Sequence, residues 1–133
     1  MKAGERRPGA TPINHNDLIS NLNDSSVVQV TSDSEFDAWL RAHGESEQEV
    51  FVAIFKKSSG KQTVTVSDLQ ETALCHGWID SRGVRIDDER WAIRFTPRRP
   101  GSNWSDKNRN SARRLLAERR MTPEGRAVLP EDL

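Results

Sequence analysis

The chain has 133 residues, of which 34% are hydrophobic and 30% are charged, with 20 basic residues balancing 20 acidic ones. This length suits one domain, and no run of eighteen apolar residues is present to span a membrane. The single cysteine, Cys75, excludes an internal disulfide, and the N-terminus lacks the apolar segment of a secretory signal. We therefore expect a cytoplasmic protein without membrane insertion.

The first half of the chain predicts a tail followed by strands and a helix. Residues 1–26 are rich in Gly, Pro, Asn, Asp and Ser and have no apolar period, so we expect a flexible tail there and a folded domain over residues 27–133. A short strand over residues 27–30 precedes a helix that Ser32 caps in a capping box and Gly44 ends. Residues 49–57, EVFVAIFKK, predict a central strand because apolar residues fall on both of its faces.

The second half predicts a helix and then a hairpin. We expect Ser67 to cap the helix and Gly77 to end it. Residues 78–80 form a short extended segment, and the sequence allows a turn at residues 82–83 and another at residues 87–89. Residues 90–98 alternate between core and solvent positions, which is typical of a strand.

Two further helices complete the prediction. Ser105 caps a long helix that runs to about residue 120, and Pro123 occupies the first position of a last short helix. The order β-α-β-α-β-β-α-α predicts a small single-domain α+β fold. We expect a mixed or antiparallel sheet of about four strands, packed by three to four helices.

Residues 94–105, RFTPRRPGSNWS, lie in the basic part of the chain. Residues 82–126 carry 13 basic and 6 acidic residues, whereas residues 1–81 carry 7 and 12. Such a basic half can attract phosphates or an acidic partner. The same arginines and tryptophans could instead tie down an edge loop with no ligand.

Alternation along the predicted strand indicates how an anion site could form. Arg94, Thr96 and Arg98 share one face, and pairing with the segment before them can bring Trp78 and Asp80 beside them. Asp80 would then orient one arginine, and the others would hold an anion bidentately. The prolines stiffen the following loop, and the start of the next helix offers free amides. The expected ligand-binding residues are Trp78, Asp80, Arg94, Thr96, Arg98, Arg99, Ser102, Trp104 and Asn108.

No residue type in the chain points to a metal or a catalytic nucleophile. Cys75 and His76 are adjacent in a helix and do not face each other, so we assign no catalytic residue. One cysteine and three scattered histidines lack the spacing of zinc ligands, and no phosphate-cradling glycine loop is present. We expect neither a metal nor a cofactor.

Three segments, ALCHGWIDS, RFTPRRPGSNWSDKN and LLAERRMTPEG, resemble the YdeI/OmpD-associated (bacteriocin-protection) family over roughly residues 36–125. The resemblance implies a small bacterial protein linked to tolerance of bacteriocins or antimicrobial peptides, in some members through association with an outer-membrane porin. No established reaction comes with it. The chain departs from the family pattern at Ser81, where glycine is common, and at His76, where an aromatic residue is common.

Together these observations predict a non-enzymatic tolerance protein that binds an anionic ligand or an acidic protein partner through its arginine- and tryptophan-rich face. A single-stranded nucleic-acid-binding module is one alternative, because basic residues with interleaved tryptophans can hold phosphates and stack on bases. An enzyme acting on a phosphorylated or carboxylated metabolite is another. This enzyme alternative lacks a convincing catalytic base, since the sequence shows no orienting partner for His76.

Overall fold

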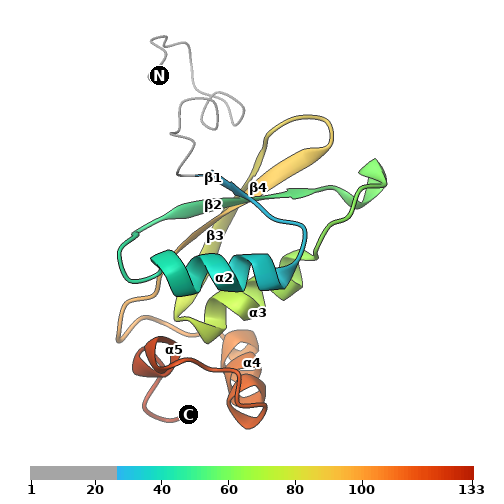
Figure 1. Ribbon diagram of the computed structural model, residues 1–133. Coiled ribbons are helices and arrows are strands. Elements are labelled where there is room, and N and C mark those ends of the chain that lie inside the picture. The colour runs from blue at the N-terminus through green and yellow to red at the C-terminus, as the bar shows by residue number, and fades with distance from the viewer. Residues whose placement is uncertain (1–26) are drawn as a thin grey trace.

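The structure, a computed structural model, describes residues 27–133, so the tail expected over residues 1–26 lies outside the described residues. The predicted order of strands and helices is confirmed, and so is the single α+β domain. The elements are β1 (Val27–Gln29), α2 (Asp33–His43), β2 (Val50–Phe55), the 3-10 turn η2 (Lys57–Ser59), α3 (Val66–Cys75), β3 (Trp78–Arg85), β4 (Arg90–Pro97), α4 (Asp106–Ala117) and α5 (Pro123–Ala127) (Figure 1).

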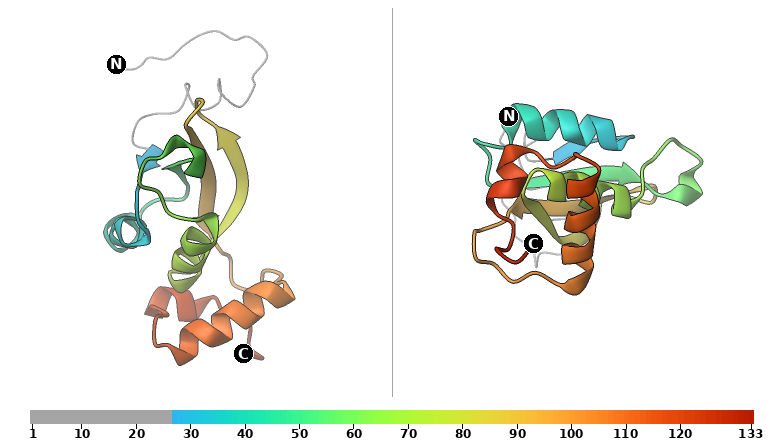
Figure 2. Two further views of the ribbon diagram at one scale, coloured as in Figure 1. Left: turned by 90° about the vertical axis from the view of Figure 1, so that its right-hand side faces the viewer. Right: turned by 90° about the horizontal axis from the view of Figure 1, so that it is seen from below.

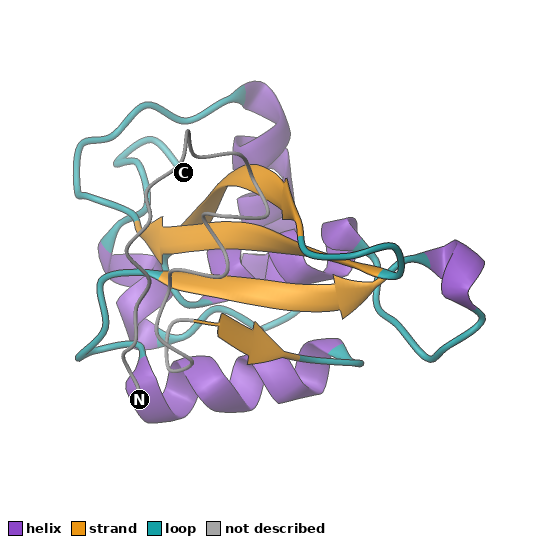
Figure 3. Cartoon of the chain, turned by 90° about the horizontal axis from the view of Figure 1, so that it is seen from above, coloured by secondary structure: helices purple, strands orange, loops and turns teal. Residues whose placement is uncertain are grey.

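The sheet is mixed, with the strand order β1-β2-β4-β3. β1 runs parallel to β2, while β2 and β3 both pair with β4 in the antiparallel sense. Figure 3 shows the strands side by side, with η2 projecting beyond the sheet. No helix over residues 27–133 combines the length and apolarity needed to cross a bilayer.

The turn predicted at residues 82–83 is wrong, because β3 continues to Arg85. A register shift between Asp80 and Gly83 forms a bulge there instead. Gly83 suits this bulge because a Cβ on it would lie 2.9 Å from the ring of Trp91. The turn at residues 87–89 is confirmed: the chain reverses there, and Asp87 accepts hydrogen bonds from the amides of Glu89 and Arg90.

Two of the three predicted serine caps are confirmed. Ser32 accepts a hydrogen bond from the third amide of α2, and Ser105 does the same for α4. The cap of α3 was predicted two residues too late. Thr65, rather than Ser67, accepts from the amide of Asp68, so the helix already begins at Val66.

Two apolar clusters organise the helices. α2 and α3 cover one face of the sheet, where Phe36, Leu40 and Leu69 pack against the inner residues of the strands. Strand β2 is buried on both faces, as predicted. α4 and α5 instead pack near the end of α3, around Leu74 and Leu115, and extend beyond the end of the sheet (Figure 2). Helices α2, α3 and α5 therefore meet near the start of β3.

Candidate ligand-binding site

The predicted arginine loop closes around one buried side chain, Arg98. Directly after β4, the Arg98 amide donates a hydrogen bond to the carbonyl of Gly77 at 2.7 Å. Arg98 is buried at this position and is only 5% exposed. Its guanidinium lies over the ring of Trp104 at 3.9 Å, and Nη1 donates to Ser102 Oγ at 3.3 Å and to the Asn103 carbonyl at 3.1 Å. The structure thus brings Arg98, Ser102 and Trp104 together as predicted, in the form of a closed clasp.

This buried guanidinium has little electrostatic compensation. Burial lowers the pKa of Arg98, and the charge of Asp80 acts in the opposite direction. Among the described residues, no group accepts a hydrogen bond from the buried Nε of Arg98. Asp80 instead accepts a hydrogen bond from Gln70 at 3.1 Å. Asp80 therefore acts on Arg98 through its charge, and not through the predicted hydrogen bond.

The expectation that Asp80 and Arg94 share a face of the sheet is wrong. The register sets Asp80 opposite Phe95, which places Asp80 on the face covered by the helices. Arg94 lies on the other face, where its Nε donates to Glu49 at 2.6 Å and its Nη1 donates to Ser81 at 3.2 Å. A shift of one residue in a strand moves every side chain to the opposite face, and the sequence did not specify the register.

The remaining predicted residues are dispersed. Trp78 is only 3% exposed and belongs to the core beneath α2. Thr96 is half-buried on the face of Arg94, and Arg99 is exposed. Asn108 lines a small hollow between α3 and α4. These residues do not converge on one pocket, so the proposed anion site has no single cavity.

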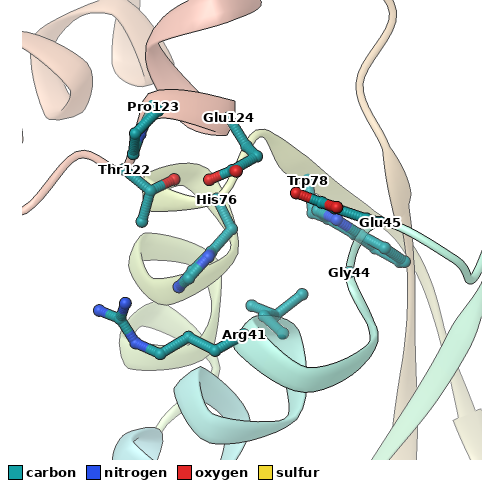
Figure 4. A pocket seen from close by; sticks show the side chains of 9 residues that line it. Arg41, Gly44, Glu45, His76, Trp78, Thr122, Pro123 and Glu124 are labelled. Atoms are coloured by element: carbon teal, nitrogen blue, oxygen red, sulfur yellow. The ribbon is translucent and has the colours of Figure 1, made fainter.

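A cavity that the sequence did not indicate lies where α2, α3 and α5 meet (Figure 4). It has a volume of about 250 Å³. We call it the carboxylate cavity; its walls are formed by Leu40, Arg41, Gly44, Glu45, His76, Trp78, Thr122, Pro123 and Glu124. α5 is held against the end of α3 by Thr122, whose amide and hydroxyl both donate to the carbonyl of Cys75, at 2.9 and 2.8 Å.

One wall of the cavity carries an oriented histidine. His76 is 8% exposed, and its Nε2 lies 2.7 Å from Oδ1 of Asp37. Asp37 also accepts a hydrogen bond from Nε of Arg41 at 2.8 Å. Burial acts to raise the pKa of Asp37, but the hydrogen bonds with His76 and Arg41 outweigh it and hold that pKa below its usual value.

Sequence reasoning missed this pair because Asp37 and His76 are 39 residues apart. Only the spacing of Asp37 and Arg41, four residues apart on one helix, was visible as a local signal. Asp37 supplies the orienting partner for His76 that the sequence did not show. The alternative of an enzyme acting on a phosphorylated or carboxylated metabolite gains a candidate base in this way and stays a prediction.

A carboxylate pair faces the histidine across the cavity. The backbone amide of Glu124 donates a hydrogen bond to the carboxylate of the same residue, which lowers the pKa of that group. The charge of His76 also contributes to this lowered pKa. Figure 4 shows the guanidinium of Arg41 turned away from Glu45 and Trp78. Arg41 is paired with Asp37, although its charge also acts on Glu124, and the acidic groups on the cavity wall are Glu45 and Glu124.

Metal and thiol chemistry find little support over residues 27–133. No group of three or more His, Cys, Asp or Glu side chains in this part of the chain is arranged to hold a metal ion. The Cys75 thiol is buried, and this burial raises its pKa. A buried thiol that stays protonated is a poor nucleophile.

A family model described as a domain of unknown function (DUF8412) matches residues 28–128. The matched segment contains both the clasp around Arg98 and the carboxylate cavity. No curated protein matches the chain, and no solved structure matches it.

Proposed function

We propose that this chain, which belongs to the family described as a domain of unknown function (DUF8412), binds a small cationic group in the carboxylate cavity. The observation that carries the proposal is the pair Glu45 and Glu124 on the wall of a cavity that Trp78 and Leu40, each 3% exposed, also line. The two carboxylates would neutralise an ammonium or guanidinium group. The indole ring and the leucine would contact its apolar stem.

The resemblance to the YdeI/OmpD-associated family supports a role for this site in tolerance of bacteriocins or antimicrobial peptides. Many antimicrobial peptides carry lysine and arginine on their polar face. A basic side chain of such a peptide, or of a protein partner, fits the charge of the carboxylate cavity. The porin-like partner that the resemblance implies remains part of this proposal.

Titration of the full chain with ethylguanidine, followed by amide and indole chemical shifts, tests the proposal. We expect shifts at Trp78 and Leu40, and none at these residues from ethyl phosphate. A double variant, Glu45→Gln with Glu124→Gln, should weaken binding about tenfold or more, because a hydrogen bond to a charged group contributes about 1.5–3 kcal/mol. The matched control is Glu47→Gln, which changes an exposed glutamate on the same loop as Glu45. Equal affinity in the double variant and the control would refute the proposal.

A second candidate function is the binding of an anionic ligand at the loop of Arg98 and Arg99. One observation favours it: a guanidinium that is almost fully buried has an Nε without a hydrogen-bond partner among the described residues. Ethyl phosphate should then shift the signals of Ser102 and Trp104, and replacing both arginines with alanine should abolish those shifts. A single-stranded oligonucleotide would act through the same charges, with an affinity that falls steeply as salt rises.

A further inference from the structure

A second hollow of about 390 Å³ lies on the other side of the Asp37–His76 pair. We call it the arginine hollow; it is lined by Asp33, Ser34, Asp37, Arg41, Thr72, Cys75, Arg119 and Arg120. Arg41 belongs to the walls of both the arginine hollow and the carboxylate cavity. The two spaces are therefore neighbours that share one wall.

Arg119 occupies a backbone position that usually requires glycine. Its φ angle is +61°, at the residue where α4 is closed by hydrogen bonds from the Arg119 amide to Leu116 and from the Arg120 amide to Leu115. A side chain in this left-handed conformation costs roughly 1–2 kcal/mol. Such strain at a residue that lines a hollow is consistent with a functional role for its side chain.

The charge of Arg119 is also uncompensated within residues 27–133. None of the hydrogen bonds or ion pairs of this region engages its guanidinium, whereas Arg120 lies 3.8 Å from Glu71 and 3.4 Å from Glu118. Arg41 is paired with Asp37. Asp33, the other acidic residue of the hollow, is the first residue of α2, about two turns away from Arg41. Arg119 therefore brings an available positive charge to a space that adjoins the carboxylate pair.

We infer that the ligand is a zwitterion in which a basic side chain is joined to a free carboxylate. The cationic group enters the carboxylate cavity, and the ligand's carboxylate reaches the guanidinium of Arg119 across the shared wall at Arg41. A guanidinium can bind a carboxylate through two parallel hydrogen bonds, which suits this recognition. The inference rests on the proposed function, because the cation must first bind beside Glu45 and Glu124.

Calorimetric titration of the full chain with two arginine derivatives tests the inference. Nα-acetyl-L-arginine and Nα-acetyl-L-arginine amide carry the same guanidinium, but only the first has a free carboxylate. We expect the free acid to bind about tenfold more tightly, as one hydrogen bond between charged groups would predict. In Arg119→Gly the ratio of the two affinities should fall to about one, while the affinity for the amide derivative stays unchanged. The substitution relieves the strained backbone at this position, so the variant should still fold. Arg82→Ala, which removes an exposed arginine of β3, should keep the preference.

The outcomes separate this inference from the proposed function. Equal binding of the acid and the amide by the unaltered chain, or a preference that survives Arg119→Gly, would overturn the zwitterion while leaving the cation site intact. Failure of both compounds to bind would overturn the proposed function and the inference together. A titration with free L-arginine distinguishes two ligands that present the same guanidinium and carboxylate: a free amino acid and the carboxy-terminal residue of a peptide. Tighter binding of free arginine supports a free amino acid, and tighter binding of the acetylated form supports the carboxy-terminal residue of a peptide.

Discussion

Replacing Gly125 with alanine should separate α5 from α3 and open the carboxylate cavity. A Cβ at this position would lie 2.1 Å from the carbonyl oxygen of Cys75 and 2.7 Å from its carbon, distances that no side-chain movement can relieve because both atoms are backbone. Helix α5 would have to shift, and the two hydrogen bonds from Thr122 to Cys75 would be lost. Overpacking costs about 1–3 kcal/mol and each hydrogen bond about 0.5–1.5 kcal/mol, so the free energy of unfolding should fall by about 2–6 kcal/mol.

Urea denaturation and thermal unfolding measure this loss. For a domain of this size we expect the melting temperature to drop by about 8 °C or more. The matched control is Gly101→Ala, since a Cβ there meets nothing within 4 Å and only the φ angle of +81° is unfavourable, which costs roughly 1–2 kcal/mol. A loss of stability in Gly125→Ala no larger than in this control would show that α5 does not pack against Cys75 as described. The variant should also bind ethylguanidine more weakly, because Glu124 lies on the displaced helix.

Two further predictions concern Asp37 and Cys75, which both line the arginine hollow. Because the folded-state pKa of Asp37 is held below its unfolded value, its contribution to stability is complete above about pH 4 and is lost as the pH falls through the folded pKa. As the pH falls below about 4, the melting temperature of Asp37→Asn should therefore decrease less than that of the unaltered chain. An equal decrease in both proteins would contradict the pairing of Asp37 with His76. The buried Cys75 thiol, whose pKa is raised, should react slowly with an aromatic disulfide reagent in the folded protein and rapidly in urea; equal rates would show that the thiol is accessible.

Local patterns in the sequence were sufficient to predict most of the fold. The continuous apolar run of β2, the serine at the start of α2 and the proline at the start of α5 each act within a few residues, so the elements and their order could be predicted. The bulge at Gly83 could not, because it depends on the approach of Trp91 from the neighbouring strand. The register of β3 on β4 could not be predicted either, because it also depends on contacts between strands. This register decides which faces of the sheet carry Asp80 and Arg94.

The candidate site was harder to predict because its partners are distant in sequence. Arg98, Ser102 and Trp104 were grouped correctly since they lie in one loop. The pairs Asp37 with His76 and Glu45 with Glu124 join different helices and loops, and no spacing rule connects them. Asp37 meets His76 because α2 packs beside α3, and Glu45 meets Glu124 because α5 docks near the end of α2.

The central claim, that a cation binds beside Trp78, can be measured directly by intermolecular nuclear Overhauser effects with ethylguanidine. We expect contacts from the ethyl protons to the indole of Trp78 and to the methyl groups of Leu40, two residues of the carboxylate cavity. Contacts to Trp104 in their place would contradict it, because they would put the ligand at the loop of Arg98.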